Sequence, residues 1–374
     1  MKRYPKLAFL LLVATICLGL VWVTERQARR ALPPELYLSG ARLTAFTSLE
    51  PIDSHTHVCA SGPAFAQMLA RLHMHVMDIL YVDANNSYLA PTGSERQDAL
   101  SFIAANPAHA QLCTTFNPYR FNEPDFSQTA FAALHDDYAR GAVAVKIWKN
   151  VGMEITDASG RYIMPDDGRF EPILRDMVAQ HKTLILHMAD PDDAWGSGDR
   201  QGESARYYTV HPEWDMSRIR GAPQKDQILK ARDHLLAMHP DLRIVGAHFG
   251  SLDMHLDALA AELDRYPNFA IDTAARMMSL VTQPRDRVRS FMIRYQDRIL
   301  YGTDLMFYPG STDQVVAQAW QKLYGLEWRY LSTDDRFYYD GIRVQGLNLP
   351  GPVLQKIYHD NAVRWYPGIE THWR

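Results

Sequence analysis

Short runs of apolar and β-branched residues recur along the chain from residue 50 onward, separated by longer amphipathic stretches. Runs that are apolar on both faces are typical of parallel strands covered by helices. Six of the seven intervals between successive runs are roughly 24 to 41 residues long, enough for one strand and one crossover helix. The eight strands predicted in this way are residues 50–58, 77–83, 110–116, 142–148, 183–188, 243–248, 269–272 and 298–304.

The stretches between these runs predict helices. Apolar residues recur with a period near 3.6 between residues 226 and 239, and Pro240 ends that pattern. Residues 252–266 repeat the pattern before Pro267. Eight strand–helix units in succession predict an α/β fold of the (β/α)₈ TIM-barrel type, with a doubly wound open sheet as the alternative. We expect one barrel domain over residues 31–374, with a last helix at 353–365 packed under the barrel.

Two connections are much longer than the others. One follows the fifth strand, at residues 190–224, and the other follows the eighth, at residues 305–349. Both leave the C-terminal ends of strands, where barrel enzymes build their active sites. Long loops in a compact domain commonly serve as lids, so we expect two long loops over the site.

The first 30 residues are predicted to be a separate segment. Residues 1–6 are basic, residues 7–23 carry no charge, and a basic stretch follows, which is the layout of a signal anchor or a signal peptide. The apolar run would span about 25 Å as a helix and precedes no clean cleavage site, so we favour an uncleaved hydrophobic helix that anchors the protein in a membrane. The basic residues before it favour a domain outside the cytoplasm, periplasmic in a bacterium.

Composition narrows the class of protein. A chain of 374 residues with 47% hydrophobic and 22% charged residues is neither disordered nor a multi-span membrane protein. The net charge of −4 combines +5 over residues 1–30 with −9 over the rest, and an acidic body is a poor partner for nucleic acid. Three cysteines make no disulfide framework, and Cys59 and Cys113 are expected to be small buried hydrophobic residues.

Potential metal ligands stand where several predicted strands end. His55 and His57 lie two residues apart on the first strand, so their side chains point to the same side. His187, His248 and Asp304 end the fifth, sixth and eighth strands. Because the C-terminal ends of barrel strands meet at one mouth, this set predicts a metal site there.

This pattern of His55-x-His57, His187, His248 and Asp304 resembles the amidohydrolase superfamily of metal-dependent barrel hydrolases. The resemblance spans about residues 50 to 366. It narrows to the amidohydrolase-related branch that includes aminocarboxymuconate-semialdehyde decarboxylase and its relatives, on the segments 145–149, 246–251, 266–272, 297–304 and 361–362. That branch contains both hydrolases and non-oxidative decarboxylases.

The resemblance implies a role for each residue. His55, His57, His187 and Asp304 would hold one divalent ion, most often Zn²⁺, and an open position would make that ion catalytic. His248 would act as a base or polarise the substrate, and Asp304 would accept a proton from water and deliver it to the leaving group. In a site with two ions, His187 and His248 would hold the second ion instead.

Three further residues have alternative interpretations. Lys146 ends the fourth strand, where relatives with two metal ions carry a carboxylated lysine that bridges them, but a structural or substrate-binding ammonium is preferred. Arg276 follows the seventh strand and could clamp a substrate carboxylate or form a surface ion pair. Asp53 could orient a ligand imidazole, although an ordinary aspartate at a strand end is preferred.

The sequence therefore predicts a metal-dependent hydrolase that uses a metal-activated water to cleave an amide-type C–N bond or an ester or lactone bond in a small organic substrate. The alternative is a metal-dependent decarboxylase of an unsaturated or aromatic carboxylic acid. A third interpretation is a membrane-tethered binding barrel without catalytic activity, and the intact set of potential ligands counts against it.

Overall fold

The computed structural model describes residues 38–83, 94–196, 202–371 and 373. The predicted hydrophobic anchor at residues 7–23 lies outside these residues and stays a prediction. Among the residues that are described, no helix is both long enough and apolar enough to cross a membrane.

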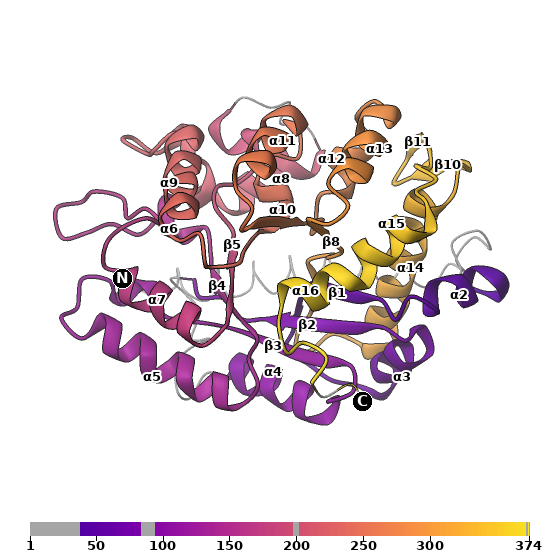
Figure 1. Ribbon diagram of the computed structural model, residues 1–374, viewed down its shortest axis with the longest axis horizontal. Helices are drawn as coiled ribbons and strands as arrows, with labels where there is room; N and C mark the ends of the chain where they lie inside the picture. Colours follow the sequence, from indigo (N-terminus) through magenta and orange to yellow (C-terminus); the bar gives the residue numbers. More distant parts are fainter. Residues whose placement is uncertain (1–37, 84–93, 197–201, 372, 374) are drawn as a thin grey trace, which may run out of the picture.

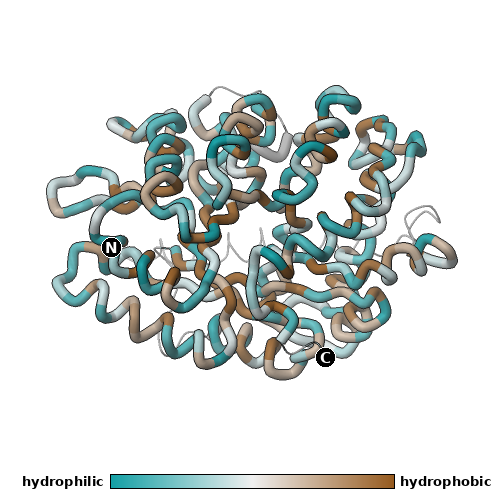
Figure 2. Tube along the Cα trace, in the orientation of Figure 1, coloured by the Kyte–Doolittle hydropathy of each residue, from teal (hydrophilic) through white to brown (hydrophobic). Residues whose placement is uncertain are grey.

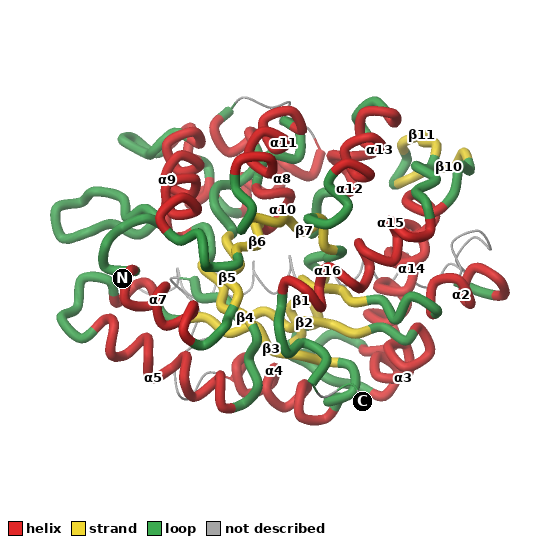
Figure 3. The backbone as a smooth tube through the Cα atoms, in the orientation of Figure 1, coloured by secondary structure: helices red, strands yellow, loops and turns green. Residues whose placement is uncertain are grey.

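A curled parallel sheet forms the centre of the protein, and each predicted strand has its counterpart in it (Figures 1 and 3). The strands run in the order β8-β7-β6-β5-β4-β3-β2-β1-β9. Their bounds are β1 (Ile52–Val58), β2 (His75–Ile79), β3 (Ala110–Thr115), β4 (Ala144–Ile147), β5 (Thr183–Leu186), β6 (Ile244–Gly246), β7 (Phe269–Asp272), β8 (Ile299–Leu300) and β9 (Leu305–Phe307).

The two outermost strands of this order belong to one stretch of chain. β8 pairs with β7, and β9 pairs with β1. Between them, the Tyr301 carbonyl accepts from the Ser54 amide at 2.9 Å, and the Asp304 amide donates to the His55 carbonyl at 2.8 Å. Residues 299–307 thus act as an interrupted eighth strand that contacts β7 at its start and β1 at its end. This arrangement is consistent with a (β/α)₈ barrel.

Helices cover the outer face of the sheet. Figure 1 shows α3, α4, α5 and α7 along one side and α9, α11 and α13 along the other. Hydrophobic positions gather along the central strands, while the outer helices alternate between hydrophobic and hydrophilic positions (Figure 2). The helix bounds are α2 (Gly40–Thr47), α3 (Pro63–Leu72), α4 (Ser94–Ala105), α5 (Phe126–Ala139), α6 (Asn150–Met153), α7 (Glu171–Ala179), α8 (Gly202–Val210), α9 (Lys225–Met238), α10 (Ala247–Gly250), α11 (Leu256–Arg265), α12 (Met277–Val281), α13 (Arg285–Arg294), α14 (Asp313–Ser332), α15 (Gly351–Gln355) and α16 (Asn361–Trp365).

The prediction of a long loop after the eighth strand is wrong. Residues 305–349 contain the 20-residue helix α14 and a hairpin of β10 (Arg336–Tyr339) and β11 (Ile342–Gln345). Trp320, Tyr324 and Trp328 recur every four residues in α14 and are buried. This spacing places the aromatic side chains on one face, so the segment packs as a barrel helix. The connection after β5 carries α8 and short 3₁₀ turns within its described part.

The C-terminal segment closes the end of the barrel opposite the strand C-termini. The predicted last helix is present as α15, a π-helical turn at Lys356–Asp360, and α16. Trp365 and Ile369 are buried in a cluster with Ile52, Val143 and Val245, near the starts of the strands. Cys59 and Cys113 are buried, as predicted.

Glu327 is a buried acid within α14. Its carboxyl group accepts hydrogen bonds from the hydroxyl groups of Tyr301 at 2.6 Å and Tyr339 at 3.3 Å. Burial raises the pKa of Glu327 from 4.5 to about 8, against the lowering effect of those hydrogen bonds. Between pH 4.5 and pH 8 the carboxyl group of Glu327 is ionised in the unfolded chain but keeps its proton in the folded protein. The free energy of unfolding therefore falls as the pH rises through this range.

We therefore expect Glu327→Gln to gain stability relative to the wild type as the pH rises from 5 to 8, by about 1 to 3 kcal/mol. Urea unfolding at both pH values measures this change. The exposed Glu123→Gln provides the control. An equal effect of Glu327→Gln at pH 5 and pH 8 would mean that Glu327 is ionised in the folded protein.

Candidate metal centre

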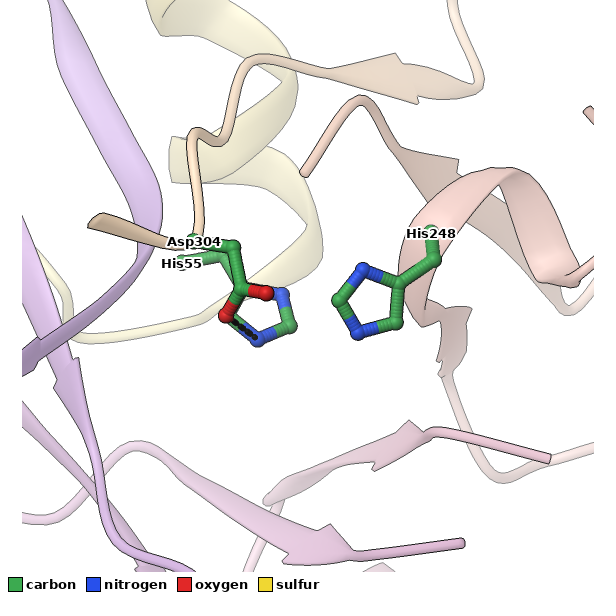
Figure 4. Close-up of side chains that lie close together, drawn as sticks. All are labelled: His55, His248 and Asp304. Atoms are coloured by element: carbon green, nitrogen blue, oxygen red, sulfur yellow. Dashed lines mark ion pairs between the residues drawn. The ribbon is translucent and has the colours of Figure 1, made fainter. Parts of the chain in front are cut away.

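Three potential ligands from separate elements converge at the C-terminal ends of the strands. They are His55 of β1, His248 of α10 and Asp304, which lies between β8 and β9. One ligand atom from each lies within 4.8 Å of the others. Figure 4 shows the carboxylate of Asp304 beside the ring of His55, with the ring of His248 facing both.

His57 and His187 extend this cluster on either side. His57 Nε2 lies 3.2 Å from Asp304 Oδ1, and His55 Nε2 lies 3.5 Å from the same oxygen. His187 Nδ1 lies 3.2 Å from His248 Nε2. The five predicted side chains therefore form one connected group, although they come from four separate places in the chain.

Hydrogen bonds to the outer ring nitrogens hold three of the imidazoles. Nδ1 of His55 contacts Asp272 Oδ2 at 2.7 Å, Nδ1 of His57 contacts the Ile79 carbonyl at 2.7 Å, and Nδ1 of His248 contacts the Ala274 carbonyl at 2.9 Å. A carbonyl or carboxylate must accept, so each Nδ1 carries the proton. Each Nε2 then presents a lone pair to the centre, as a metal-binding histidine does.

The ionisation of the group also suits a cation. Burial lowers the pKa of His55, His187 and His248, and the charge of Lys146 lowers it further for His55 and His187. Burial alone would raise the pKa of Asp304, but the surrounding imidazoles of His57, His248 and His55 hold it well below its usual range. A divalent ion prefers this combination of neutral imidazoles and an ionised carboxylate.

Strained backbone conformations concentrate where the strands enter the centre. Residues other than glycine adopt a positive φ after β5, β6, β7 and β8, at Ala189, His248, Phe249, Ser251, Ala275 and Asp304. Such conformations persist only where the surrounding structure enforces them, and they cluster at functional sites. Glycine at position 302 lets the chain pass close to His55, since a Cβ there would lie only 2.9 Å from the Cβ of His55.

A cavity of about 1130 Å³ opens over the group and reaches His187, His248 and Asp304. Arg276 lines this cavity, its side chain is 12% exposed, and its Nε lies 3.6 Å from Asp253 Oδ1. Arg276 therefore has an ion-pair partner, as one interpretation expected, but the pair lies on the cavity wall and not on the outer surface. Lys146 is buried inside the group, with Nζ 3.2 Å from His55 Nε2, and burial lowers its pKa.

Asp53 does not orient a ligand ring. Its carboxylate accepts from the amides of His55 at 3.2 Å and Thr303 at 3.0 Å and from the Tyr324 hydroxyl at 3.0 Å, so it links β1 to the interrupted eighth strand and α14. Asp272 is the carboxylate that contacts His55, and its position at the end of β7 was the signal that could have identified it. Lys149 and Asp190, a buried ion pair on the cavity wall, were also missed.

Comparisons with known proteins place the chain among its relatives. The family model described as amidohydrolase matches residues 52–368. An uncharacterised TIM-barrel protein from Bordetella bronchiseptica is 15% identical, with 85% of this chain and 99% of that chain covered and a TM-score of 0.50, a likeness that supports the fold alone. A 2,6-dihydroxybenzoate decarboxylase structure is 14% identical over 84% and 99% of the two chains, with a TM-score of 0.46. Among curated proteins, none matches.

Proposed function

Because this chain belongs to the amidohydrolase family, a family of metal-dependent enzymes, we propose that it is a hydrolase that cleaves an amide-type C–N bond or an ester or lactone bond in a small organic substrate. The observation that carries the proposal is the convergence of His55, His248 and Asp304 to within 4.8 Å, beside a large cavity that His248 and Asp304 line. His57 and His187 adjoin them at 3.2 Å.

The nitrogen and oxygen donors of this cluster suit a divalent ion. His55, His57, His187 and Asp304 would hold it, and Zn²⁺ is the ion that nitrogen and oxygen ligands of this kind most often select. The bound ion would lower the pKa of water and so supply a nucleophile at neutral pH. A second ion would need His187, His248 and a carboxylated Lys146. We favour one ion, with Lys146 as an ammonium that binds substrate.

Asp304 and His248 carry the proton transfers in this proposal. Asp304 is ionised, so its carboxylate can accept a proton from the attacking water and return that proton to the leaving group. Neutral His248 faces the same space through Nε2 and can orient the water or hydrogen-bond to the substrate. Arg276, on the cavity wall beside Asp253, would bind an anionic group of the substrate bidentately.

The decarboxylase remains the alternative because Arg276 gives the cavity a cation that suits a carboxylic acid. In that reaction Asp304 or His248 would first take up a proton from solvent and would deliver it to the carbon whose bond to the departing carbon dioxide breaks, and water would not attack. The two reactions place the same residues around different bonds.

Metal analysis and isotope labelling test the proposal together. We expect purified protein to bind close to one equivalent of zinc and to hydrolyse a member of an amide, lactone and ester panel with incorporation of ¹⁸O from labelled water. Release of carbon dioxide from an unsaturated or aromatic acid, without ¹⁸O incorporation, would replace the hydrolase with the decarboxylase. Protein that binds no divalent metal would overturn both reactions.

A further inference from the structure

The residues after β6 form a left-handed turn that carries His248. The four residues from His248 to Ser251 all have φ between 57° and 62°, and Gly250 is the one glycine among them. Two hydrogen bonds lie within the turn, from the Ser251 amide to the His248 carbonyl at 3.0 Å and from the Leu252 amide to the Phe249 carbonyl at 3.1 Å. The turn points the ring of His248 toward the centre (Figure 4). Because a run of left-handed residues is strained, it persists only where the surrounding structure enforces it.

A buried arginine contacts this turn from the side of α9. Arg232 lies on the apolar face of that helix, four residues after Ile228 and three before Leu235, where the helical period predicts an apolar side chain. Its side chain is 1% exposed, and arginine is rarely buried to that extent unless it is paired. Nη1 of Arg232 donates to the Gly250 carbonyl at 2.7 Å. A hydrogen bond from a charged donor is stronger than a neutral one, and burial strengthens it further.

Two acids and an aromatic ring fix the guanidinium of Arg232 at this place. Its Nε and Nη2 donate to Asp233 Oδ1 at 3.1 and 2.9 Å, and Nη2 also pairs with Glu262 of α11. The guanidinium carbon lies 5.2 Å from the ring centroid of Phe269, a cation–π distance. The same ring packs against the turn, since a Cβ at Gly250 would lie 3.2 Å from it. These partners leave Nη1 directed at the Gly250 carbonyl.

We propose that Arg232 is a positioning residue, which holds the Gly250 carbonyl and so keeps the left-handed turn and the ring of His248 in place. Asp272 and Ala274 accept from the amide and the ring of His248 itself. Arg232 holds the second half of the turn. It is not among the described residues that line the cavity, so it acts on the reaction only through His248. The effect on the reaction rests on the proposed function, whereas the effect on the turn does not.

Hydrogen exchange of the metal-free protein tests the effect on the turn. We expect the Ser251 and Leu252 amides to exchange at least about tenfold faster in Arg232→Met, because the hydrogen bonds of the turn protect them. Arg232→Lys is the second variant, since it keeps a positive charge beside Asp233 and Glu262 and so favours a folded protein. Its single ammonium does not reproduce the fork that serves both acids and the turn, so we expect faster exchange there too. Unchanged protection of both amides in the Arg232 variants overturns the proposal.

Steady-state kinetics of Arg232→Lys test the effect on the reaction. We expect kcat to fall about 10- to 100-fold while KM and zinc content stay within about twofold of the wild type, because His248 moves relative to the reacting groups and the binding groups stay. Glu262→Gln is the matched control, since it removes a partner of Arg232 but leaves the donor to Gly250. It should lower the melting temperature without changing kcat or the exchange of the Ser251 amide.

The outcomes separate the inference from the proposed function. An unchanged kcat in Arg232→Lys, or an equal fall in kcat in Glu262→Gln, overturns the positioning role and leaves the proposed function intact. A wild type that hydrolyses nothing in the panel overturns the proposed function. Hydrogen exchange at the turn then decides the inference by itself.

Discussion

Replacement of Asp304 by asparagine is expected to lower kcat/KM by about 10³- to 10⁴-fold. The ionised carboxylate contacts both His55 and His57 at distances of 3.5 and 3.2 Å, and it is the one acid in the cluster of potential ligands. The amide keeps the size of the side chain but cannot accept a proton from water. Its weaker donor oxygen would also reduce the affinity for a divalent ion.

Steady-state kinetics with the substrate found in the panel, together with zinc content and melting temperature, measure this effect. Asp257→Asn is the control because its carboxylate is 94% exposed on α11. A variant with a normal fold, full zinc content and a rate within tenfold of the wild type would remove Asp304 from the proton transfers.

The strands and the group of potential ligands were predictable because both depend on local pattern. Apolar runs reveal strands that are buried on both faces. His57, His187 and Asp304 each stand where such a run ends, and a barrel brings these ends together regardless of their distance along the chain. The predicted convergence therefore followed from topology, without knowledge of any individual contact.

The hydrogen bonds that hold the potential metal ligands in place could not be predicted in this way. Asp53 and Asp272 both stand near strand ends, but only the packing decides that Asp272 contacts the His55 ring while Asp53 binds Thr303 and Tyr324. The aromatic residues of α14 lie in the segment that was predicted to be a long loop, although their spacing is helical. Side-chain partners across the sheet depend on register, which a single sequence does not encode in an obvious form.

Asp272→Asn is expected to change the tautomer of His55. In the wild type, Oδ1 of Asp272 accepts from the amides of His248 at 2.8 Å and Ala274 at 3.1 Å, and Oδ2 accepts from His55 Nδ1 at 2.7 Å. Asparagine has a single oxygen, and the two backbone amides would retain it. The NH₂ group would then face His55 Nδ1, which must accept, so the proton would move to Nε2.

An imidazole with a proton on Nε2 cannot offer a lone pair to the centre through that atom. We therefore expect Asp272→Asn to bind zinc about 10- to 100-fold more weakly and to lose up to about 10⁴-fold in kcat, because His55 would be in the wrong tautomer. Asp78→Asn is the matched control, because Asp78 is equally buried, accepts from the Val58 amide at 2.8 Å, and has its pKa raised by burial to about 8. Chelator competition gives the affinity and ¹⁵N spectra give the tautomer. If His55 in Asp272→Asn keeps its proton on Nδ1 and zinc affinity is unchanged, the orientation of His55 is set by β1 packing and not by this carboxylate.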